Sequence, residues 1–332
     1  MALRLRPETP LPEGIRQAML HLIGEGRAGL KRTDDRTEGI HDARKAFKKA
    51  RAIARLVRRS LGPAWRAEDR FWRDLGRALS AERDAQAVLE AFDALLGDEG
   101  RGPTFAPLRA LLERRQGEVV QFPAHDGSAS ASPAEEDLDA SLDGAEERVR
   151  AWPLGEGFGP LAEGLETGYR RARRRRRRAR REPSASNLHA WRRAVKQHAA
   201  QIRLFRDAAP EPLTAHLALV DELAHVLGED HDLDVLRTLL TEEDAAWADP
   251  GMLGGVLERM ARRHASLRRR AFSLGERALA ERPKAFRRRL RGYWLAFVKD
   301  EAGERKTSAL AETGAAPEPA EPASAPPDQA AG

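Results

Sequence analysis

The sequence feature that most constrains the fold is an internal repeat with an offset of 148 residues. Without any gap, this offset pairs matching residues in the two halves of the chain: His41 with His189, Arg44 with Arg192, Lys48 with Lys196, Arg55 with Arg203, Leu56 with Leu204, Arg58 with Arg206, Leu75 with Leu223, Leu79 with Leu227, and Asp84 with Asp232. The helix-breaking segments 62–63 and 210–212 also coincide. Agreement of so many residue types in one register indicates two homologous halves in tandem.

Each half is expected to consist of helices alone. Ala, Leu, Arg and Glu dominate the chain and favour helices, whereas the strand-forming residues Val, Ile, Thr and Tyr are sparse. The expected helices span 13–31, 40–61, 64–96, 103–122, 160–182, 188–208, 212–240 and 251–274, with two more at 134–152 and 282–299. Because short loops favour antiparallel neighbours, the sequence predicts an all-α fold of two tandem antiparallel bundles with basic surfaces facing a shared cleft or pore.

The chain divides into one helical domain and a tail. We expect the domain to span 7–299, with a first bundle over 7–122, an acidic linker and possible helix over 123–152, and a second bundle over 153–299. The tail over 300–332 is acidic and rich in Ala and Pro, with too few large apolar side chains to offset the entropy of ordering. We therefore predict that the tail is disordered.

Several classes of protein are excluded by composition. The chain has no cysteine, which excludes disulfides, thiolate zinc sites, iron–sulfur clusters and cysteine nucleophiles. No apolar run approaches the ~18 residues of a membrane span, and the first residues lack the apolar stretch of a secretory signal. We expect a cytoplasmic protein without membrane contact.

The net charge of +6 hides a segregation of charge along the chain. Segments 126–147 and 300–332 hold 15 acidic residues and two basic ones, so the rest of the chain carries 56 basic residues against 37 acidic ones. An imbalance of this size favours a polyanionic partner.

The second helix of each half carries a row of cations on one face. Spacings of three and four residues place these side chains in line: His41, Arg44, Lys48, Arg51, Arg55 and Arg58 in the first half, and His189, Arg192, Lys196, Arg203 and Arg206 in the second. Like charges at this spacing cost free energy, which a polyanion lying along the helix would turn into attraction. Arg offers bidentate donation to phosphate oxygens, Lys a point charge, and His donors together with charge when protonated.

Other basic residues are expected to extend these rows. Ten of the twelve residues from 170 to 181 are arginine, and this run directly precedes the second histidine helix. The further candidates for binding a polyanion are Lys45, Arg193, Arg170, Arg173, Arg174, Arg177, Arg114, Arg115, Arg262 and Arg263, of which the last four match at the 148 offset.

These motifs resemble the conserved histidine α-helical domain family, CHAD. The resemblance covers about 7–299 and rests on the two His-x-x-Arg rows, on Arg83-Asp84 and segment 231–235 (HDLDV), and on segment 169–173 (YRRAR). The family implies a two-bundle helical fold whose basic surfaces bind inorganic polyphosphate, often at polyphosphate granules in bacteria, without catalysis or a cofactor. Some members of the family carry an attached triphosphate-tunnel domain, whose E-x-E-x-K marker is absent from this sequence. The first half departs from the family pattern at Gln86, where the second half has Asp234.

Two alternative functions use the same residues. A nucleic-acid-binding protein could use the same basic surfaces, although aromatic residues make up only 5% of the chain and no nucleic-acid-binding motif is present. A metal-dependent phosphohydrolase of the HD type could use His41-Asp42 and segment 229–234 (EDHDLD), although a basic row would repel a divalent cation. We therefore expect no catalytic or metal-binding residue, and we expect Asp84 and Asp232 to pair with arginines of the neighbouring basic helix.

Overall fold

The structure is a computed structural model that describes residues 3–79, 81–121, 135–242 and 250–313. Within these ranges every regular element is a helix, which confirms the all-α prediction. The α-helices are α1 (Leu11–Leu30), α2 (Arg36–Leu56), α3 (Trp65–Ala78), α4 (Ala81–Leu96), α5 (Ala106–Gln121), α6 (Glu135–Arg150), α7 (Gly159–Arg181), α8 (Ala185–Arg203), α9 (Pro210–Glu242), α10 (Pro250–Ala278) and α11 (Pro283–Thr313). None of the described helices combines the length and apolar character needed to cross a membrane.

Local signals explain where the two histidine helices begin. The side chain of Asp35 accepts a hydrogen bond from the backbone N–H of Glu38 at the start of α2. The side chain of Ser184 does the same for the backbone N–H of Asn187 at the start of α8. Such caps satisfy backbone donors that have no partner within the helix.

Two pairs of helices in the two halves begin at positions that differ by the offset of the sequence repeat. Helices α1 and α7 begin at residues 11 and 159, and α6 and α11 begin at 135 and 283, so both pairs differ by 148. In the first half α1 packs on α2 and α6, α2 packs on α3, and α4 packs on α5. In the second half α7 packs on α8 and α11, α8 packs on α9, and α9 packs on α10.

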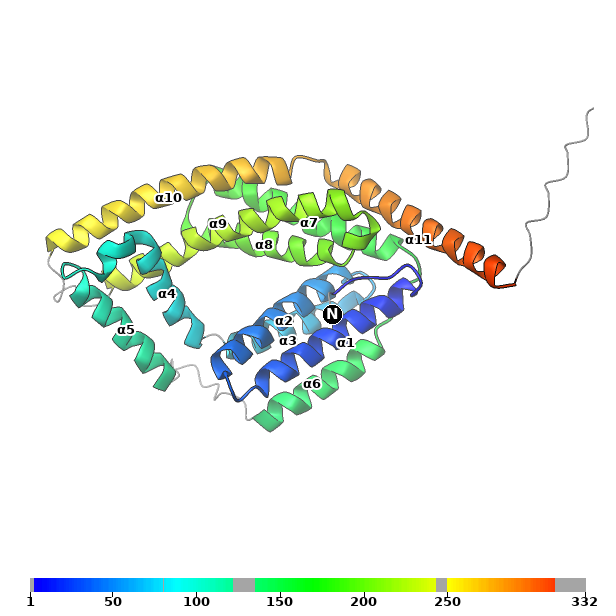
Figure 1. The fold of residues 1–332 in the computed structure, drawn as a ribbon, viewed down its shortest axis with the longest axis horizontal. Helices are drawn as coiled ribbons and strands as arrows, with labels where there is room; N and C mark the ends of the chain where they lie inside the picture. Colours follow the sequence, from blue (N-terminus) through cyan, green and yellow to red (C-terminus); the bar gives the residue numbers. More distant parts are fainter. Residues whose placement is uncertain (1–2, 80, 122–134, 243–249, 314–332) are drawn as a thin grey trace, which may run out of the picture.

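The two halves interlock, which corrects the expectation that 7–122 forms a bundle of its own. The single helix expected over 64–96 is two helices, α3 and α4, whereas the matching part of the second half is the one helix α9. Helix α3 packs on α2, but α4 packs on α9 and, more weakly, on α10 of the other half. The α4–α5 pair therefore lies beside the far end of α9 and α10, at the left of Figure 1. The physical reason is the apolar stripe of α4, since Val88, Phe92 and Leu96 are buried.

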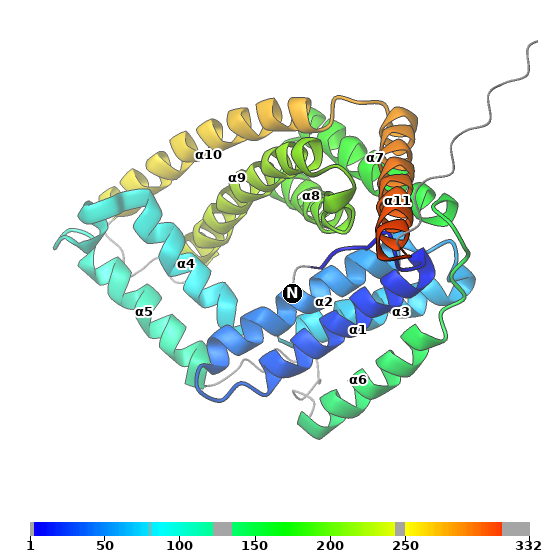
Figure 2. The same cartoon turned by 45° about the vertical axis from the view of Figure 1, so that its right-hand side comes forward.

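The expected boundary of the disordered tail is also corrected. Helix α11 continues through Thr313, so the part of the tail from 300 to 313 is helical, and the rest of the tail lies outside the described residues. Figure 1 shows the later turns of α11 extending to the right of the other helices, and Figure 2 shows the start of α11 beside α7. The helix is held mainly at its start, where Phe286, Leu290 and Trp294 are buried.

The first half meets the second where α2 contacts α7 and α8. A Cβ atom at Gly164 of α7 would overlap the backbone oxygen of Leu56 in α2, so only glycine allows this approach. Close by, the side chain of Gln201 in α8 donates a hydrogen bond of 2.9 Å to the carbonyl of Ala52 in α2. This contact of backbone on backbone fixes how the arginines on α2, α7 and α8 face one another.

The substitution Gly164→Ala is expected to lower the free energy of unfolding by about 1–3 kcal/mol, because the added methyl group forces α7 away from α2. Chemical denaturation measures this loss. The matched control is Gly292→Ala in α11, where an added Cβ meets no atom within 4 Å, and it is expected to keep or raise stability. Equal stability of the two variants would contradict the close approach.

Candidate functional site

Six arginines from four helices converge where the two halves meet, and we call this group the junction cluster. Its members are Arg51 and Arg55 of α2, Arg77 of α3, Arg171 and Arg175 of α7, and Arg193 of α8. The positive charge of Arg171 is repelled by Arg55, Arg175 and Arg51, and that of Arg193 by Arg51, Arg175, Arg55 and Arg77. These mutual repulsions place cations of both halves in one group.

One carboxylate, Asp69 of α3, lies inside the junction cluster. Arg51 donates to it twice, from Nε to Oδ1 at 2.9 Å and from Nη2 to Oδ2 at 3.0 Å. Arg55 donates from Nε to Oδ1 and from Nη2 to Oδ2, the latter at 2.8 Å. The remaining Nη1 of Arg55 donates to Oε1 of Gln197 in α8 at 3.1 Å, so Arg55 links α2, α3 and α8.

The electrostatics of the junction cluster are unbalanced. Burial lowers the pKa of Arg171 to about 10, and repulsion by Arg55 and Arg175 adds to the effect. Burial and repulsion by Arg51 likewise lower the pKa of Arg193. Both guanidinium groups stay charged at neutral pH, and neither they nor Arg175 form an ion pair with any acid among the described residues. Asp69 therefore does not pair with every cation of the group, and Arg171, Arg175 and Arg193 keep positive charge that no described ion pair neutralises.

Asp69 itself is held firmly in the charged form. Burial alone would raise the pKa of the Asp69 carboxyl, but hydrogen bonds from Arg55 and Arg51 lower it well below its usual range. Asp69 thus shows how the cluster binds an anion: the guanidinium groups of Arg51 and Arg55 each donate hydrogen bonds to both oxygens of one carboxylate.

The row of cations in the second half is partly neutralised by an acid of the protein itself, which the sequence does not predict. Arg203 donates to both carboxylate oxygens of Asp221, so one cation of that row is neutralised by α9. The guanidinium of Arg192 lies over Gly228 of α9, where an added Cβ would come within 3.2 Å of its Nη2. Lys196 is exposed.

His189 lies beside a second histidine, and its surroundings favour the neutral form of its ring. Its ring packs against that of His231, with centroids 4.1 Å apart. Burial lowers the pKa of His189 to about 4, and the neighbouring His231, Arg193, Arg192 and Lys196 act in the same direction. His189 is therefore expected to be neutral at pH 7, so the charge that histidine carries when protonated is not expected at this position.

The structure brings only some of the predicted binding residues together. Arg51, Arg55 and Arg193 lie in the junction cluster, whereas several others are engaged with groups of the protein itself. Arg170 pairs with Glu166, Arg173 donates to the carbonyl of Glu281, Arg262 pairs with Glu258, and Arg263 pairs with Glu229. The arginines of α10 that match at the 148 offset are thus in ion pairs.

The other predicted residues lie along the surface or within the bundle. Arg44 is buried, His41 and Arg206 are partly exposed, and the side chain of Arg115 lies outside the described residues. Arg58 is exposed, and its Nη2 lies 3.5 Å from Oγ1 of Thr167 in α7. The exposed cations of the set also include Lys45, Lys48, Arg114, Arg174 and Arg177.

Sequence reasoning missed Arg77, Arg171, Arg175 and the central Asp69. The sequence does contain a signal for two of them. Arg171 and Arg175 are four residues apart and therefore share a face of α7, as Arg51 and Arg55 share a face of α2. In a run with arginine on every face of the helix, the spacing could not indicate which face meets α2.

The acidic segment 229–234 of α9 connects this helix to α10 through hydrogen bonds. Oδ1 of Asp230 lies 2.7 Å from Nδ1 of His264 and accepts a hydrogen bond of 2.9 Å from Nε of Arg268, both in α10. No group of three or more His, Asp or Glu side chains among the described residues is placed to hold a metal ion. The side chain of Asp84, which the sequence predicts to pair with an arginine of the neighbouring basic helix, lies outside the described residues.

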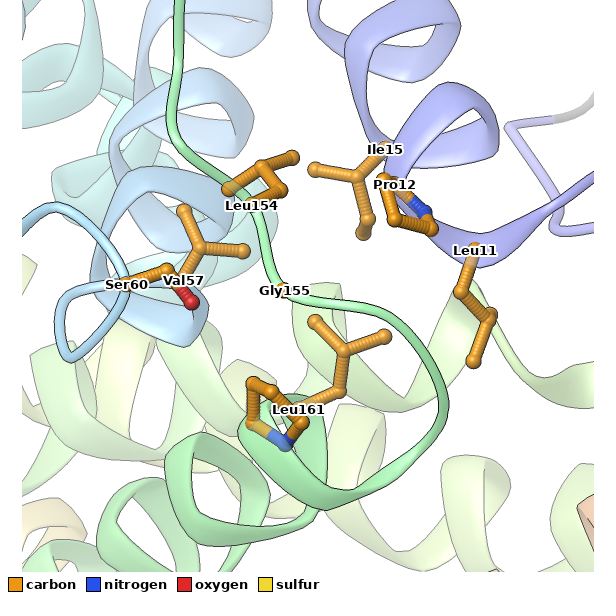
Figure 3. A pocket seen from close by; sticks show the side chains of 9 residues that line it. Leu11, Pro12, Ile15, Val57, Ser60, Leu154, Gly155 and Leu161 are labelled. Atoms are coloured by element: carbon orange, nitrogen blue, oxygen red, sulfur yellow. The ribbon is translucent and has the colours of Figure 1, made fainter.

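A small apolar pocket also lies between the halves, and Figure 3 shows it between the start of α1, the end of α2 and the start of α7. Its lining includes Leu11, Ile15, Val57 and Leu161, and none of its lining residues titrates. It offers no group for acid–base or nucleophilic chemistry, so the junction cluster is the stronger candidate site.

Comparison with known proteins identifies this architecture. The family model described as "CHAD domain" matches residues 14–241. A similar solved structure is the crystal structure of the CHAD domain from the plant Ricinus communis, with a TM-score of 0.60, 19% identity, and coverage of 84% of this chain and 95% of that one. At this identity the likeness shows a shared fold. Among curated proteins no match is found.

Proposed function

This chain belongs to the CHAD family, and on that premise we propose that it binds inorganic polyphosphate through the junction cluster without catalysing a reaction. The observation that carries the proposal is the convergence of six arginines from both halves, of which Arg51 and Arg55 bind the carboxylate of Asp69 and three others form no ion pair among the described residues. Like charges held close together in a partly exposed group cost free energy that a bound anion recovers. A linear polymer with a negative charge at every phosphate can supply several such charges at once.

The chemistry of the cluster suits phosphate. Each guanidinium presents parallel N–H donors that match two oxygens of one phosphate group. Arg55, fixed by Gln197 of α8 as well as by Asp69, would hold one phosphate where the halves meet. Arg171, Arg175 and Arg193 would take up neighbouring phosphates of the same chain. In a cell that stores polyphosphate, this binding would place the protein at polyphosphate granules.

Salt is expected to weaken the complex steeply. If about five cations of the cluster release counterions on binding, affinity falls about a hundredfold between 50 and 200 mM salt. Fluorescence titration with long-chain polyphosphate at four salt concentrations measures the slope. A slope near zero would mean that charge does not drive binding, and the proposed function would be wrong.

The same titration separates polyphosphate from nucleic acid. Duplex DNA and single-stranded RNA, added as competitors at matched phosphate concentration, are expected to displace polyphosphate poorly. Sugars and bases hinder the entry of nucleic-acid phosphates between the arginines, and the junction cluster has no aromatic member on which bases could stack. Displacement by nucleic acid at equal or lower concentration would favour a nucleic-acid-binding function for the same cluster. Turnover of the polymer in the presence of Mg²⁺ or Mn²⁺ would contradict the proposal that binding is non-catalytic.

A further inference from the structure

We propose that Asp69 is a resident anion that occupies one phosphate position of the junction cluster and makes the cluster select long polyanions over short ones. The inference rests on the proposed function and specifies how the same site is regulated. Asp69 accepts hydrogen bonds from two guanidinium groups, with each carboxylate oxygen bound to both Arg51 and Arg55. Two oxygens of a phosphate group would occupy the same pair of forks.

The arrangement is specific to the first half of the chain. At the 148 offset, Leu217 stands in the place of Asp69 and Ala199 in the place of Arg51. In the second half a single arginine, Arg203, meets a single acid, Asp221, whose side chain is 46% exposed. The side chain of Asp69 is only 15% exposed. One arginine would be enough to join α2 and α3 through Asp69. The second arginine therefore points to a further role for this group where the two halves meet.

Selection by length follows from competition at the twin fork formed by Arg51 and Arg55. A short anion depends on this fork and must displace a carboxylate that is already covalently held beside it, which gives the carboxylate a high effective concentration. A long chain can bind Arg171, Arg175 and Arg193, which form no ion pair among the described residues, whether or not it also takes the fork. Removing the resident anion therefore helps a short ligand more than a long one.

Asp74 provides a matched control on the same helix. Its carboxylate is paired with Arg73, from Nε to Oδ1 at 2.7 Å, and lies outside the twin fork. The charge of Asp74 is nevertheless felt by Arg51 and Arg77. Asp74→Asn thus removes the same charge from the same region without vacating the fork.

The test measures binding of tripolyphosphate and of long-chain polyphosphate to the full chain by calorimetry at one salt concentration. We expect Asp69→Asn to tighten tripolyphosphate binding about tenfold, or ~1.4 kcal/mol, and long-chain binding by a clearly smaller factor. Asp74→Asn is expected to change both affinities by the same small factor. Asp69→Leu, which copies the second half, is the second variant and keeps the test open if the first folds poorly.

Several results would overturn the inference. Asp69 would be a positioning group if both of its variants bind tripolyphosphate no better than the native protein. General charge would explain the data if Asp74→Asn matches Asp69→Asn. If the native protein and every variant fail to bind the long chain, the proposed function falls and this inference with it. If the native protein binds the long chain but Asp69 variants keep its length selectivity, only this inference falls.

Discussion

The double variant Arg171→Glu/Arg193→Glu is expected to bind long-chain polyphosphate about a thousandfold more weakly than the native protein. Each lost contact to a charged group is worth roughly 1.5–3 kcal/mol, and each new carboxylate also repels the polymer. Both residues lie in the junction cluster without an ion pair among the described residues, so the substitution breaks no described salt bridge. Fluorescence titration at constant salt measures the change.

Two controls distinguish this effect from a loss of net charge or of fold. Arg288→Glu/Arg291→Glu makes the same change in net charge on exposed positions of α11, and it is expected to weaken binding only a few-fold. The melting temperature of the cluster variant is expected to stay level or rise, because the new carboxylates relieve repulsion among Arg51, Arg55 and Arg175. Equal weakening in both double variants would show that polyphosphate binds the protein through general charge and would remove the junction cluster as its site.

Acid is expected to destabilise the protein through a buried pair of histidines. Nε2 of His198 lies 3.0 Å from Nε2 of His216, and both rings pack against Phe286 of α11. Burial lowers the pKa of both, in His216 to about 4, where Arg289 lowers it further and Glu281 opposes the change. Because the unfolded chain has the ordinary value of about 6.5, it takes up protons first as the pH falls.

The expected loss begins below pH 6.5 and continues to about pH 4. His216 alone contributes about 2 kcal/mol of lost stability between pH 7.5 and pH 5, and His198 acts in the same direction. Denaturant unfolding at these two pH values measures the loss. The double variant His198→Gln/His216→Gln retains hydrogen-bonding groups but cannot titrate, so its stability is expected to vary less with pH. Parallel pH dependence in the native protein and the variant would contradict this role of the pair.

Much of the fold was predictable because it depends on local periodicity. The 148 offset predicts matching helices, and α6 and α11, which correspond to the two further helices expected from the sequence, begin at positions that differ by 148. The break between α3 and α4 was not predictable, because Leu79 fits a helix as well as its neighbours do. The break lets α3 pack on α2 while α4 packs on α5 and on α9 of the other half.

The candidate site was predictable in kind and only partly in detail. Arg51 and Arg55 were identified from the one-sided row of the first half and Arg193 as a further candidate, whereas Arg171 and Arg175 were not singled out within a run of arginines. The arginines of α10 were grouped with the site by register, yet Arg262 and Arg263 are paired with glutamates. The 148 offset specifies which arginines of the two halves are equivalent, but the acids that lie near these arginines differ between the halves.

The sequence by itself determined the helices, their order and the faces on which the cations stand, because these follow from a period of 3.6 residues and from short-range propensity. The tertiary structure alone decided which cations meet. The close approach at Gly164 brings α7 against α2, and the charges of Arg171 and Arg55 repel each other across these helices. It also decided that one carboxylate, Asp69, would lie among them, because contacts between residues distant in the chain depend on helix crossing and packing, which no local pattern encodes.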